Sequence, residues 1–125
     1  MPLYFPPSGG GGGGGATPDT VVSVAYAASI TPDLSAGNVF RIGTLTGPVT
    51  INAPSTTPAD AKKIYFQFAQ DATGGRVITW DNIYRFGFDI SAVDISTSPL
   101  AENRIAFIWN TSLSKYEFAG ISRMA

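Results

Sequence analysis

Side chains that could perform chemistry are few in this chain, and those that enzymes use most often are missing. The 125 residues contain no histidine and no cysteine. This excludes Ser-His-Asp and Cys-His nucleophilic sites, histidine general bases and thiolate metal sites. Paired carboxylates remain a candidate, because a glycosidase needs only two. Asp71 and Asp81 flank an expected hairpin, but the simpler interpretation is that Asp71 caps a turn and Asp81 ends a strand.

The other candidate reactive groups also have simpler structural explanations. Asp89 and Asp94 would lie on opposite faces of a strand, and Lys62 and Lys63 stand together in a polar loop. The glycine run near the N-terminus has no preceding strand and no following Gly-Lys-Ser/Thr, which excludes a phosphate-binding loop. The formal net charge of −1 gives no electrostatic reason to expect nucleic acid or an anionic membrane as a partner. We therefore expect a protein that is not an enzyme and has no cofactor or metal.

Aromatic residues supply one further kind of candidate site. Five of them could form a platform that stacks against sugar rings, as in a carbohydrate-binding module: Trp80, Tyr84, Phe86, Trp109 and Tyr116. The same residues could instead pack in the core or at a contact between subunits, and this second interpretation is favoured. They are therefore candidates for an interface or for sugar stacking.

The elements that would position these side chains are strands and turns. From residue 20 onward, short stretches rich in β-branched and aromatic residues alternate with turns. The expected strands cover residues 21–26, 38–45, 49–52, 64–69, 76–80, 89–95, 104–109 and 116–119. Two hairpins are expected, one joining 64–69 to 76–80 through Gly74-Gly75 and one joining 104–109 to 116–119. The sequence predicts an all-β fold, a single antiparallel β-sandwich or jelly-roll-like domain over residues 20–125.

Residues 1–19 differ from the rest and form an extended arm rich in proline and glycine. Leu3, Tyr4 and Phe5 stand between prolines, which favour extended backbone. An uninterrupted glycine run follows: Gly9, Gly10, Gly11, Gly12, Gly13, Gly14 and Gly15. The run is either a flexible linker or an ordered strand in a narrow space, and ordering it would cost about 1–2 kcal/mol per residue. We expect these residues to serve in assembly, with the apolar tip anchoring the arm in a groove.

Several stretches of the chain resemble a known family. FRIGTLTGPVTINAP at 40–54 is followed by FQFAQDATGGRVITW at 66–80, and the chain continues with AFIWN at 106–110 and KYEFAG at 115–120. Together they resemble a small β-domain of tailed-bacteriophage virion structural proteins. The stretch 81–100 departs from that family's pattern, which commonly has a glycine- and proline-rich connection there.

The resemblance implies a virion component, usually homotrimeric, of a fibre, a tail appendage or the capsid surface. We expect a capsid decoration or cement protein anchored through the arm. The alternatives are a trimeric tail-fibre or tail-appendage subunit and a carbohydrate-binding module. Its partners would be copies of itself and the major capsid or tail proteins, with no nucleic acid and no membrane. The first residues lack a basic region and a continuous apolar stretch, so we expect no signal peptide and synthesis in the host cytoplasm.

Overall fold

The computed structural model describes residues 18–86 and 96–124. They contain no helix and form nine strands. The strands are β1 (Val21–Val24), β2 (Ser29–Ile30), β3 (Val39–Ile42), β4 (Val49–Ile51), β5 (Lys63–Ala69), β6 (Ile78–Trp80), β7 (Tyr84–Arg85), β8 (Glu102–Asn110) and β9 (Lys115–Met124). The all-β class expected from the sequence is confirmed. The expected strand at 89–95, with Asp89 and Asp94, lies outside the described residues.

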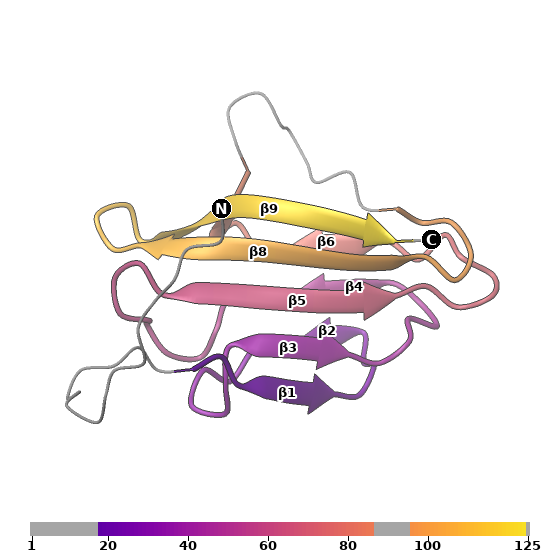
Figure 1. Ribbon diagram of the computed structural model, residues 1–125, viewed down its shortest axis with the longest axis horizontal. Coiled ribbons are helices and arrows are strands. Elements are labelled where there is room, and N and C mark those ends of the chain that lie inside the picture. The colour runs from indigo at the N-terminus through magenta and orange to yellow at the C-terminus, as the bar shows by residue number, and fades with distance from the viewer. Residues whose placement is uncertain (1–17, 87–95, 125) are drawn as a thin grey trace, which may run out of the picture.

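The strands form two sheets, and the chain alternates between them. The larger sheet has the order β1-β3-β5-β8-β9-β7 and the smaller one the order β2-β4-β6. Figure 1 shows the smaller sheet behind the larger one. Strands β1, β3 and β5 are mutually parallel, and so are β2, β4 and β6. The first six strands therefore make three stacked coils, each contributing one strand to each sheet.

Because the strands are parallel and in register, apolar residues of successive coils lie on top of one another. Phe40 pairs with Phe66 across β3 and β5, and their rings lie 5.8 Å apart. In the smaller sheet Ile30 pairs with Ile51, which in turn pairs with Trp80. These rows fill the space between the sheets with large apolar side chains, the favourable burial that holds the layers together.

Alternation along each strand decides which side chains enter this core. In β5 every second residue is buried, and in β8 the same alternation runs through the whole strand. The buried apolar residues contributed by the larger sheet include Phe40, Ile42, Ile64, Phe66, Phe68, Ile105, Phe107, Trp109 and Tyr116. The remaining residues of these strands lie on the outer face of the larger sheet, which no other described element covers (Figure 1).

One of the two expected hairpins is wrong. Strand β5 pairs with β3 and β8 in the larger sheet, whereas β6 pairs with β4 in the smaller one. The connection between them crosses from one layer to the other, a gap of about 10 Å. Two apolar strands with glycines between them fit either a hairpin or such a crossing, because each buries only its inward face. The larger sheet is consequently mixed, not antiparallel throughout.

The second expected hairpin is confirmed. Strands β8 and β9 are antiparallel neighbours joined by a short polar loop, and β9 continues to Met124, beyond its expected end. The register shifts between Ala106 and Phe107, which marks a β-bulge. This hairpin extends the larger sheet past the last coil.

Two buried amide side chains form hydrogen bonds with the backbone of loops that approach the sheet, as a neighbouring strand would. The Gln70 amide donates to the Arg76 carbonyl oxygen at 3.0 Å and accepts from the Arg76 N–H at 2.9 Å. Asn103 makes the same pair of hydrogen bonds with the backbone of Ser96, both at 3.0 Å. Because a buried amide without partners is costly, these bonds fix the two loops onto the sheet.

The turn after Gln70 is held by Asp71, as expected. Its carboxylate accepts from the Gly74 N–H at 2.9 Å and from the Arg76 guanidinium at 2.7 Å. The hydrogen bond from the Arg76 guanidinium, the largest cause, keeps the pKa of Asp71 below its ordinary value of 3.8. A carboxyl whose folded-state pKa is lowered stabilises the fold above its unfolded-state pKa, and this contribution disappears as the pH falls through the folded-state pKa.

Asp71→Asn should therefore lower the melting temperature at about pH 6 and make progressively less difference below about pH 4. Asparagine can still accept from the Gly74 N–H, so the variant removes mainly the ion pair. The measurement is the melting temperature of both proteins from about pH 6 to about pH 2. The difference in melting temperature between the two proteins at each pH removes the contribution of the other carboxyl groups, which both proteins share. A difference that stays constant over the whole range would contradict this account.

Candidate protein-binding surface

The five aromatic residues singled out in the sequence come together in the core. Tyr84 lies 5.3 Å from Trp80 and 5.6 Å from Tyr116, and Trp109 lies 5.0 Å from Tyr116, all between ring centroids. Phe86 packs on Trp80 at 6.1 Å. Tyr84, Trp109 and Tyr116 are buried, whereas Trp80 and Phe86 are half-buried against the same cluster.

The polar atoms of these buried rings differ in whether they have a hydrogen-bond partner. The Tyr84 hydroxyl donates to the Asn52 carbonyl oxygen at 2.9 Å, and burial raises the pKa of Tyr84 above its ordinary value. Burial also raises the pKa of Tyr116 to about 12. The Trp109 Nε1 is buried and has no hydrogen-bond partner among the described residues. Both tyrosines therefore stay neutral near neutral pH, and three of the five rings have no exposed face for a sugar.

The candidate catalytic carboxylates serve separate turns. Asp71 is engaged as described above, and Asp81 accepts from the Ile83 N–H at 2.9 Å. Over residues 18–86 and 96–124, no three acidic side chains gather in a way that could hold a metal ion. The arm residues Leu3, Tyr4, Phe5 and Gly9 to Gly15 lie outside the described part of the chain.

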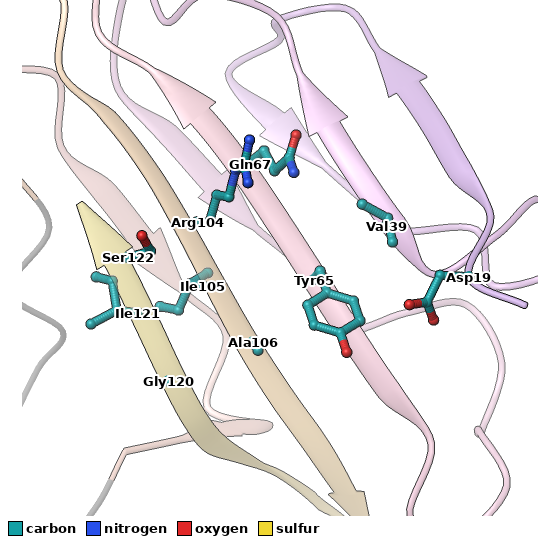
Figure 2. Close-up of a pocket in the computed structure, with 10 residues that line it drawn as sticks. All are labelled: Asp19, Val39, Tyr65, Gln67, Arg104, Ile105, Ala106, Gly120, Ile121 and Ser122. Carbon is teal, nitrogen blue, oxygen red and sulfur yellow. The ribbon is translucent and has the colours of Figure 1, made fainter. Parts of the chain in front are cut away.

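A groove of about 470 Å³ lies on the outer face of the larger sheet. Its floor follows one register row that crosses four strands: Val39 on β3, Tyr65 on β5, Ala106 on β8 and Gly120 on β9. Figure 2 shows the Tyr65 ring between Ala106 on one side and Val39 and Asp19 on the other. Apolar side chains thus occupy outward positions where a solvated sheet face usually carries polar ones.

The hollow exists because two neighbouring positions lack large side chains. Ala106 pairs with Gly120, and a Cβ atom added to Gly120 would meet no atom within 4 Å. The Tyr65 ring stands beside this gap and forms its wall. The bulge in the hairpin begins at Ala106, so the backbone also bends here.

A polar row borders the apolar one. The next outward register row contains Arg41, Gln67, Arg104 and Ser122, and the last three line the groove. Arg41 Nε donates to the Gln67 side-chain oxygen at 2.8 Å. Arg104 thus stands along one side of the groove, and Asp19 stands at the end beside β3. An apolar floor with a polar rim is the composition of a protein-binding patch.

A second hollow of about 360 Å³ opens at the end of the sandwich. Pro18, Ala36, Lys62 and Lys63 lie around it, together with the buried Tyr116. It differs from the groove in being lined largely by loop residues.

Comparison with known protein families gives a match. Residues 30–101 match the family described as "Putative phage tail fibre C-terminal domain", which is more than half of the 125-residue chain. The chain belongs to this phage tail-fibre family. No curated protein and no solved structure gives a significant match. The resemblance of the sequence to a small phage virion domain is confirmed, and the family indicates a structural role.

The groove of this tail-fibre domain combines matched and unmatched residues. The match begins at Ile30 on β2 and ends at Ala101, just before β8. Val39 and Tyr65 therefore belong to the matched region, whereas Ala106 and Gly120 come from the C-terminal hairpin. Among the described residues no helix is long and apolar enough to cross a membrane.

The groove was not predicted from the sequence, although the sequence contains a signal for it. Val39 and Tyr65 stand at outward positions of their strands, where alternation would place polar residues. That signal becomes informative only when the register shows the outward apolar residues in one row. The small residues Ala106 and Gly120, far along the chain, gave no signal by themselves.

Proposed function

We propose that this domain is a non-enzymatic, homotrimeric subunit of a phage tail fibre and that it works by binding other protein chains. The family match carries the proposal, because it names a tail-fibre domain. The apolar groove supports a protein partner, because it lies on a sheet face that no other described element covers. The low proportion of charged residues, 14%, also suits a surface that other chains cover.

The family favours the tail over the head. The sequence alone favoured capsid decoration over a tail-fibre or tail-appendage subunit, whereas the description of the matched family supports the tail-fibre alternative. A carbohydrate-binding module loses support, since the tryptophan and tyrosine rings proposed for stacking are largely packed in the core. The arm, residues 1–19, remains the proposed assembly segment.

Phage particles assembled without this chain should keep stable heads and lose adsorption to the host. The reason is that a tail-fibre subunit acts in attachment, whereas a decoration protein reinforces the capsid. The measurements are the adsorption rate and the loss of infectivity on heating. Unstable heads with normal adsorption would contradict a fibre role and restore capsid decoration. In solution, a mass of one chain at every concentration would contradict the homotrimer.

A further inference from the structure

The groove on the larger sheet lies where the arm joins the domain. Asp19 lines the groove beside Val39 and Tyr65, and the described chain begins one residue earlier, at Pro18. The preceding residues therefore start close to this groove, and also close to the second hollow, which Pro18 lines. The arm carries the most apolar short segment of residues 1–17, Leu3-Tyr4-Phe5.

The arm has a suitable length to bring that segment into the groove. From the β3 end of the groove to β9 the distance is three strand spacings, about 14–15 Å. Thirteen residues, 6–18, separate Phe5 from Asp19. A random-coil linker of that length has a root-mean-square span of about 18–22 Å. Because effective concentration is highest when the linker span is close to the distance required, the arm is long enough to place the segment in its own chain's groove at a high effective concentration.

The segment Leu3-Tyr4-Phe5 and the groove are chemically complementary. A sheet face offers side chains and no free backbone groups, so a segment lying on it needs no strand pairing. Prolines on both sides of Leu3-Tyr4-Phe5 favour extended backbone and lack the N–H donors that would otherwise need partners. An aromatic ring fits the gap over Ala106 and Gly120, and the polar rim provides Gln67 and Arg104 for a tyrosine hydroxyl.

We propose that in the free subunit the segment Leu3-Tyr4-Phe5 binds in the outer-face groove of its own chain, over Ala106 and Gly120. This rests on the proposed function only in taking the groove to be a protein-binding surface. Assembly into the fibre would then require the segment to leave the groove, which exposes the apolar face and the apolar tip together.

Disulfide trapping tests this directly, because the full chain has no cysteine of its own. The variant Tyr4→Cys with Gly120→Cys should oxidise within one chain at least about ten times faster than a matched control. The control is Tyr4→Cys with Ala36→Cys, since Ala36 is exposed and lines the second hollow together with Pro18. An unbound arm would reach Ala36 at least as readily as Gly120. Circular dichroism of the reduced proteins checks that each variant is folded.

Filling the groove provides a second measurement. Gly120→Leu places its side chain in open space, so the fold should persist. It should slow the trapping of Tyr4→Cys by Ser122→Cys, another groove residue, to the rate of the Ala36 control. No slowing would show that the segment does not occupy the gap and would overturn the proposal.

Three further outcomes would overturn the proposal, and the last of them would do so while leaving the proposed function intact. Equal rates for Gly120 and Ala36, or faster trapping at Ala36, would overturn the proposal that the arm binds in the groove. Cross-linking between chains when the Tyr4→Cys and Gly120→Cys proteins are mixed would show exchange between copies and overturn binding within one chain. If trapping fails and Gly120→Leu nevertheless prevents assembly into particles, the groove still binds a protein segment, and only its proposed occupant is wrong.

Discussion

Replacing Phe66 by alanine is expected to lower the free energy of unfolding by about 3–5 kcal/mol, the cost of deleting a fully packed aromatic ring. Phe66 is completely buried at the centre of β5. Its ring lies within 5.4–6.2 Å of five other ring centroids, those of Phe40, Phe68, Trp80, Tyr84 and Phe107. These rings come from both sheets and both halves of the chain, so the cavity cannot close by moving one element.

Urea-induced unfolding of Phe66→Ala measures the loss. Small domains are stable by about 5–15 kcal/mol, so a loss of this size removes a large share of the stability and should clearly lower the urea midpoint. Val77→Ala is the control, because Val77 is 59% exposed and its truncation should change the stability by less than about 0.5 kcal/mol. Similar unfolding midpoints for the two variants would contradict the packing described for this core.

Gly74→Ala should lower the free energy of unfolding by about 2–5 kcal/mol, although Gly74 lies in a turn. Its φ of 71° is in the left-handed region, which costs an L-residue about 1–2 kcal/mol. A Cβ atom there would also approach the Thr97 carbonyl oxygen to 2.7 Å and the Pro99 nitrogen to 2.8 Å. Both are backbone atoms, so the loop that contacts the turn would have to move.

Gly75→Ala is the matched control for that prediction. Gly75 has nearly the same φ, 76°, but an added Cβ atom would meet nothing within 4 Å. Its substitution should cost only the conformational part, about 1–2 kcal/mol. The measurement is the difference in unfolding free energy between the two variants. Equal losses would mean that the turn does not contact residues 97–99 as the structure shows.

Local patterns predicted most of the individual elements. Alternation placed β5 and β8 correctly, and the polar loop between two apolar strands identified the β8–β9 hairpin. Asp71 was expected to cap its turn and does so. These features depend on residues close together in the sequence, where spacing and turn chemistry are sufficient. The two-residue strands β2 and β7 were missed because so short a segment has no periodicity.

Apart from the β8–β9 pair, strand partners were decided only by the tertiary structure. The residues of 64–69 and 76–80 suit a hairpin and a crossing between layers equally well, because either arrangement buries the same inward faces. The choice depends on β3 and β8, which pair with β5, and on β4, which pairs with β6. Those strands are distant in the sequence, so no local pattern contains the information.

By itself the sequence determined that this protein is an all-β domain without histidine or cysteine chemistry, and it indicated a phage virion component. The tertiary structure decided where the candidate binding surface lies. Tyr65, Ala106 and Gly120 come from three strands, and the groove appears only when the register aligns one large ring with two small residues. The physical reason is that composition and alternation specify which face of a strand is apolar, whereas a hollow requires knowing which residues are neighbours on that face.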